Sequence, residues 1–163
     1  MTKDIAAATT PERKAVQTVR AMAAVVGATF VLVGILGFVP GVTTNLDAIT
    51  WAGHESGAEL FGIFEVSVLH NVLHLGFGVA GLVLARSVIG SLRYLLWGGV
   101  AYLGLWAYGV IVDHDHGANV VPVNDADNWL HLGLSIGMIF LAAVGRGLLT
   151  PRAAERAPGR ATN

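Results

Sequence analysis

Three histidines lie in stretches of sequence that are otherwise apolar, and imidazole nitrogens can ligate a metal or haem iron or carry a proton. His70 and His74 are one helical turn apart, so an α-helix would place them on one face. His131 lies in a separate apolar stretch. Ionisable groups inside a membrane cost several kcal/mol unless they are paired. These three residues therefore mark the first candidate for a functional site.

Two carboxylates stand just before these histidines in the chain. Glu65 precedes His70 and His74, and Asp127 precedes His131. The candidate cofactor-binding residues for haem b are the three histidines, and the candidate metal ligands are the same histidines with Glu65. The remaining polar side chains of the two stretches form a predicted polar seam, consisting of Ser67, Asn71, Asp127, Asn128 and Ser135.

Four hypotheses fit these residue types. A haem could be held by one histidine from each of two helices, or a divalent metal by imidazoles with Glu65. Alternatively, a proton or solute could pass inward from the outer face. The structural hypothesis is that neutral imidazoles hydrogen-bond across helices and join them. No catalytic residue is assigned, because the sequence contains no G-x-S-x-G, H-E-x-x-H or phosphate-loop pattern.

Four long apolar segments must position these side chains. Hydrophobic residues make up 54% of the 163 residues and charged residues only 13%. A helix rising 1.5 Å per residue crosses a hydrocarbon core of about 30 Å in about 20 residues. The predicted spans are 21–39, 60–85, 94–112 and 128–148. The sequence thus predicts an all-α, polytopic membrane four-helix bundle, with a disordered tail at 1–20 and a basic tail at 149–163.

Charge is sorted between the two sides of these segments. All ten Lys and Arg residues fall in the two tails, at their borders or in the connection between the second and third segments. Seven of the eleven acidic residues fall in the other two connections, and an eighth, Glu65, lies near the outer end of the second segment. Because basic residues next to spans stay in the cytoplasm, both termini are predicted to be cytoplasmic, in an inner membrane. The net charge of −1 argues against a nucleic-acid partner.

A short repeat divides the chain into two halves. The sequence at 71–76 reads NVLHLG and the sequence at 128–133 reads NWLHLG, so the two copies differ at a single position. Each copy begins a segment running from the outer to the inner side. The sequence therefore predicts two parallel copies of one helical hairpin, with polar faces meeting inside the bundle.

Two other features concern ligands and partners. The stretch from Asp113 to His116 alternates Asp and His, which could offer oxygen and nitrogen to a divalent ion, although an exposed acidic turn is the simpler interpretation. Gly133 and Gly137 form a GxxxG pair that could support association with another copy or another membrane protein. The absence of cysteine excludes disulfides, thiolate metal sites and iron–sulfur clusters.

The motifs LVGILGFVPGVT at 32–43, LFGIFEVSVLHNVLHLGFGVAGL at 60–82 and NVVPVNDADNWLHLGLSIGMI at 119–139 resemble a known family. This family comprises small four-span bacterial membrane proteins, notably actinobacterial, that are classed as a domain of unknown function. The resemblance covers about residues 21–148 and implies a multi-pass membrane protein without an assigned activity. It marks as signature positions Glu65, His70, Asn71, His74, Asn128 and His131.

We expect a non-enzymatic accessory or scaffold module whose partners are the bilayer and another membrane protein or a second copy. Its polar seam would hold the helices together. A haem- or metal-binding redox protein using His70 or His74 with His131 is the alternative, and a small proton or solute pathway is the second alternative.

Overall fold

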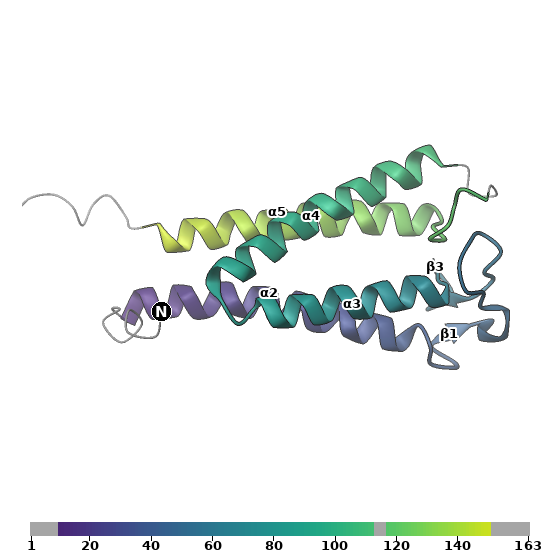
Figure 1. The fold of residues 1–163 in the computed structure, drawn as a ribbon, viewed down its shortest axis with the longest axis horizontal. Helices are drawn as coiled ribbons and strands as arrows, with labels where there is room; N and C mark the ends of the chain where they lie inside the picture. The colour runs from purple at the N-terminus through teal and green to yellow at the C-terminus, as the bar shows by residue number, and fades with distance from the viewer. Residues whose placement is uncertain (1–9, 113–116, 151–163) are drawn as a thin grey trace, which may run out of the picture.

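The computed structural model of the protein describes residues 10–112 and 117–150. Within these residues the chain forms the helices α2 (Thr10–Leu36), α3 (Val68–Leu84), α4 (Val88–Ile111) and α5 (Asp125–Leu149). Helix α2 packs along α3 and helix α4 packs along α5, so the bundle consists of two helical hairpins lying side by side (Figure 1). The start of α2 and the end of α5 lie at the same end of the bundle (Figure 1).

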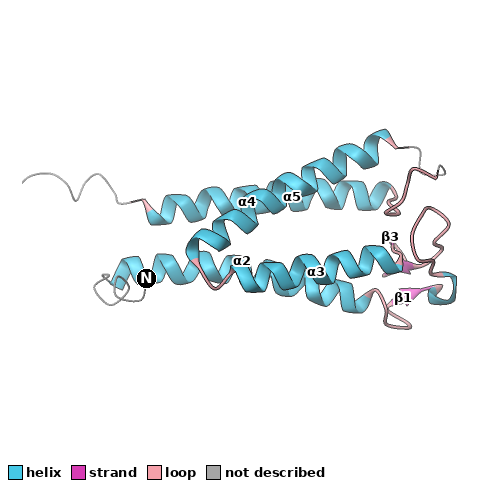
Figure 2. Ribbon diagram, viewed as in Figure 1, coloured by secondary structure: helices cyan, strands magenta, loops and turns pink. Residues whose placement is uncertain are grey.

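A small antiparallel sheet covers part of the opposite end. Its strands, in the spatial order β1-β2-β3, are β1 (Thr43–Thr44), β2 (Glu59–Leu60) and β3 (Phe64–Glu65). The 3-10 helix η1 (Leu46–Ala48) follows β1. Figure 2 shows the strands beside the end of α3, within the long connection from α2. Three buried apolar residues under the sheet, Ala58, Leu60 and Val66, form a core separate from that of the helices.

Helix α3 begins later than the span predicted from residue 60. Ser67 has extended backbone angles and its hydroxyl accepts a hydrogen bond from the backbone N–H of His70, which fixes the first turn at Val68. In the residues before Ser67, β2 pairs with β1 and β3 pairs with β2, so this part of the chain forms the sheet instead of continuing the helix. Glu65 consequently lies on a strand outside the helix, and not in the membrane-spanning segment where we expected it.

Helix α2 begins earlier than predicted, because Thr10–Arg20 is helical although we expected it to be disordered. Glu12 lies in its first turn, where a negative charge interacts favourably with the helix dipole. The helix therefore extends beyond its apolar part. The rest of the predicted N-terminal tail, at 1–9, and most of the basic C-terminal tail, at 151–163, lie outside the described residues.

The helices have the length and surface of membrane spans. Helices α2, α4 and α5 are each long and apolar enough to cross a bilayer, and α3 is a shorter apolar helix of 17 residues. Large apolar side chains on the bundle's outer surface are exposed, including Val25, Ile89, Trp97, Ile136 and Phe140. A bilayer would cover such a surface. The structure confirms the predicted all-α membrane helical bundle.

In both hairpins, glycines allow the backbones of the two helices to approach closely. A Cβ added at Gly27 of α2 would lie 2.9 Å from the backbone oxygen of Gly78 on α3. A Cβ added at Gly99 of α4 would lie 3.0 Å from the backbone oxygen of Ser135 on α5. The interval from Gly78 to Ser135 is the same as that between the two copies of the NVLHLG repeat. Equivalent positions therefore make equivalent close contacts between helix backbones, as small residues do in membrane proteins.

Candidate functional site

The histidine cluster, which comprises His70, His74 and His131, lies where the two hairpins meet. The Ser67 cap places His70 in the first turn of α3, and His74 follows one turn later. The rings of His70 and His74 have centroids 4.5 Å apart, and the rings of His70 and His131 have centroids 6.3 Å apart. His70 is 4% exposed and His131 is 3% exposed. The structure thus brings together all three histidines singled out in the sequence.

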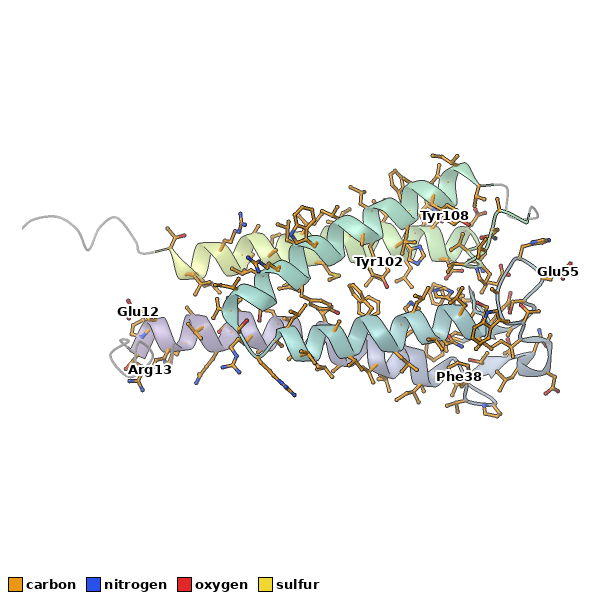
Figure 3. The ribbon with its side chains drawn as sticks, in the orientation of Figure 1. Glu12, Arg13, Phe38, Glu55, Tyr102 and Tyr108 are labelled. Carbon is orange, nitrogen blue, oxygen red and sulfur yellow. The ribbon has the colours of Figure 1, made fainter. Side chains whose placement is uncertain are left out.

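An aromatic layer, defined here as Phe30, Phe77 and Tyr102, packs against the cluster. The Phe30 ring lies 5.7 Å from His74, and the Tyr102 ring lies 5.4 Å from His131. Phe30 and Tyr102 also stack on each other at 5.3 Å. Figure 3 shows Tyr102 on α4, on the side that faces the other hairpin. Phe30 follows Gly27 by the same interval as Tyr102 follows Gly99, so the aromatic contacts obey the same repeat as the glycine contacts.

Each hairpin contains one asparagine that bonds to the helix preceding it. The Asn71 side-chain amide donates to the backbone carbonyl of Gly37 at 2.9 Å. The Asn128 amide donates to the carbonyl of Gly109 at 3.0 Å. Both asparagines are buried, and a Cβ at either glycine would collide with the asparagine side chain. These asparagines of the predicted polar seam therefore join helices within each hairpin rather than between hairpins.

Asp127 links the second hairpin to the sheet of the first through hydrogen bonds. Asn124 caps α5 through a capping box in which its side chain accepts from the Asp127 backbone N–H. One oxygen of Asp127, Oδ2, accepts from the backbone N–H groups of Asn124 and Glu65, each at 3.1 Å. The Asn124 amide also donates to the carbonyl of Ile63 at 2.8 Å. Asp127 is buried, and its role in the structure is to fix the end of α5 against β3.

The histidines themselves make few hydrogen bonds. The Nδ1 atoms of His70, His74 and His131 are buried and have no hydrogen-bond partner among the described residues. The backbone carbonyls of Glu65 and Pro122 face the His70 ring as acceptors. The bonds between helices that we assigned to histidine in the structural hypothesis are formed by asparagine instead. An unpaired buried nitrogen is costly, so each of the three needs an explanation.

The cofactor hypotheses receive different support from this geometry. The described residues contain no group of three or more His, Asp or Glu side chains already arranged to hold a metal. Glu65 lies on β3, where its backbone N–H donates to Asp127. The aromatic layer fills the space between the hairpins beside the cluster, where a haem would need a wide slot. The Asp113 to His116 stretch lies outside the described residues.

The aromatic layer is a part of the site that residue types do not predict. Phe30, Phe77 and Tyr102 are apolar or nearly so in apolar helices, so their types alone do not set them apart. One signal was present, because Phe30 and Tyr102 stand in the same order within their helices as Gly27 and Gly99. Finding it requires an alignment of the two halves with different offsets for the first and second helices of each hairpin.

These features define a polytopic helical membrane protein built from two equivalent hairpins, with a histidine cluster between them. The chain belongs to the family described as a domain of unknown function, DUF4383, which matches residues 20–144. No curated protein and no solved structure matches it.

Proposed function

We propose that this membrane protein is a non-enzymatic accessory module that binds an apolar transmembrane helix of a partner protein. The observation that carries the proposal is an unfilled apolar groove of about 290 Å³ between α2 and α5. Its lining includes Val25, Thr29, Gly133, Gly137 and Leu141. The Thr29 hydroxyl donates to the carbonyl of Val25, so it is paired within its own helix.

The opposite side of the hairpin interface shows why the groove is open. Between α3 and α4, the Phe77 ring packs 4.9 Å from Tyr94 and 5.4 Å from Tyr102. The position equivalent to Phe77 in the second hairpin is Leu134, which lines the groove. Leu134 has a smaller side chain than Phe77, and the groove lies on its side of the hairpin interface.

Two glycines allow a helix to approach this groove closely. A Cβ added at Gly133 or Gly137 would meet nothing within 4 Å. Elsewhere in the bundle, as at Gly27 and Gly78, glycines bring two helix backbones into contact. A partner helix seated over Gly133 and Gly137 would use the same packing that holds each hairpin together.

Photocrosslinking in native membranes tests this proposal. A photoreactive residue replacing Val25, an exposed side chain that lines the groove, is expected to give one reproducible protein adduct, and Gly133→Leu should abolish it by filling the groove. The matched control is Val110 on α4, which is similarly exposed and does not line the groove. The proposal is wrong if positions 25 and 110 give only the same lipid adducts.

We further propose an inner-membrane location with both termini in the cytoplasm. The sorting of charge supports it, because Arg13 lies at one end of the bundle and Glu55 at the other (Figure 3). The chain contains no cysteine, so single cysteines can be introduced and labelled without background. A cysteine replacing Thr10 should react only after the membrane is permeabilised, whereas one replacing Glu55 should react in intact cells. The reverse pattern would overturn this orientation.

A further inference from the structure

We propose that the histidine cluster binds a single copper(I) ion between the imidazoles of His70 and His131, with His74 adjacent. The site lies apart from the groove of the proposed function, and either proposal can fail without the other. It joins the two hairpins, since His70 comes from α3 and His131 from α5.

The donor atoms are the three unpaired Nδ1 atoms. A neutral imidazole has one N–H donor and one lone pair, so a buried ring without a partner at Nδ1 can offer that nitrogen to a metal. Buried histidines with a free nitrogen and a fixed ring are typical metal ligands, and imidazole suits copper and zinc. The rings of the aromatic layer fix two of the three imidazoles, Phe30 against His74 and Tyr102 against His131.

The spacing of the rings fits an ion between two imidazoles. With a metal–nitrogen distance of about 2 Å, two imidazoles on opposite sides of one ion have centroids about 6.4 Å apart. The observed separation of His70 and His131 is 6.3 Å. The separation of His70 and His74, 4.5 Å, fits only a strongly bent pair. Two ligands suffice for copper(I), so the site does not need the set of three that the described residues lack.

The surroundings favour a monovalent ion over a divalent one. The cost of moving an ion from water to an apolar interior rises with the square of its charge. Here the donors are neutral imidazoles. The carboxylate oxygen Oδ2 of Asp127 is committed to the backbone N–H groups of Asn124 and Glu65. Zinc(II) would bring twice the charge of copper(I) to the same neutral donors.

Copper(I) titration of the purified full-length protein in detergent, under ascorbate and without oxygen, tests the site. Competition with a chromogenic copper(I) chelator should show one ion per chain, and His70→Gln or His131→Gln should weaken binding by at least about ten-fold. X-ray absorption of the loaded wild type should show two or three nitrogen ligands and no sulfur. His54→Gln is the control, since His54 lies in the connection between α2 and α3, outside the cluster.

Three results would overturn the proposal: no copper retained by the wild type, equal affinity in both cluster variants, or tighter binding of zinc(II) than of copper(I). If the wild type retained no copper, buried water would be the partner of the Nδ1 atoms. Should either variant fail to give a monodisperse protein, the absorption spectrum is recorded on a variant in which His54, His114 and His116 are replaced by Gln, because imidazole ligation that remains there comes from the cluster.

Discussion

The two hairpins share the same helix caps and helix-to-helix bonds but differ in their outer connections and in the side chains at the hairpin interface. Both have a polar N-cap on the second helix, Ser67 in the first hairpin and Asn124 in the second, at equivalent positions of the repeat. In both, the asparagine one helical turn further on bonds to a glycine carbonyl of the preceding helix. The two halves of the bundle therefore use the same caps and the same bonds between helices.

The differences are concentrated at the outer end and along the hairpin interface. Asn71 is 34 residues beyond its glycine partner, whereas Asn128 is 19 beyond its own. The additional length of the first hairpin belongs to the connection that contains the sheet. At equivalent positions, the first hairpin has His70 and Phe77 where the second has Asp127 and Leu134. The histidine cluster and the open groove both depend on these differences between the hairpins. The candidate functional sites therefore lie where the two copies of the repeat diverge.

The largest effect is expected from filling the close contact of either hairpin. Gly27→Leu and Gly99→Leu should each destabilise the protein by about 3 kcal/mol or more, because the new side chain meets the backbone of the facing helix. Unfolding of the purified protein in mixed micelles measures this. Gly133→Leu is the control and should cost far less, since its Cβ meets open space. Unequal effects at Gly27 and Gly99 would break the equivalence of the hairpins.

A smaller and matched loss is expected at the two asparagines. Asn71→Leu and Asn128→Leu remove the bonds to Gly37 and Gly109, and each should lower the free energy of unfolding by about 1–2 kcal/mol. The same unfolding assay measures both. An asparagine whose replacement has no effect would show that its hairpin is held by glycine packing alone.

The N-caps of the two hairpins are expected to contribute differently to the free energy of unfolding. Asn124→Ala should cost about 1–2 kcal/mol and Ser67→Ala about 1 kcal/mol or less. The reason is that Asn124 both caps α5 and donates to the Ile63 carbonyl, whereas among the described residues the Ser67 side chain accepts a single bond, from the His70 backbone N–H. Thermal unfolding of the two variants would show the difference, and a larger loss at Ser67 would contradict it.

The smallest effect is expected where the hairpins carry nearly identical rings. Tyr102→Phe gives α4 the ring that Phe30 provides on α2, and its stacking on Phe30 and His131 is retained. The free energy of unfolding should change by less than about 0.5 kcal/mol. Tyr102→Ala, which removes the ring, is the contrasting variant. A large loss in Tyr102→Phe would assign a structural role to the hydroxyl.

The sequence predicted three of the helices well because membrane spans need long apolar runs. Helix α5 contains the whole predicted run 128–148, α4 contains 94–112 except its last residue, and α2 contains 21–39 except its last three residues. It misplaced the start of α3, because residues 60–64 are as apolar as a span. Leu60 instead belongs to β2 and Phe64 to β3, and the residues between them form the turn that joins these strands. Local composition does not distinguish a buried strand from a helix in so short a run.

The sequence by itself determined the membrane class, the hairpin repeat and the three histidines as the candidate site, because hydropathy and residue type act over short distances along the chain. Only the tertiary structure decided which histidine of α3 lies beside His131, that asparagines rather than histidines bond between helices, and that an aromatic layer packs against the cluster. These depend on how two hairpins meet, and no spacing within one helix fixes the contacts between helices that are distant in the chain.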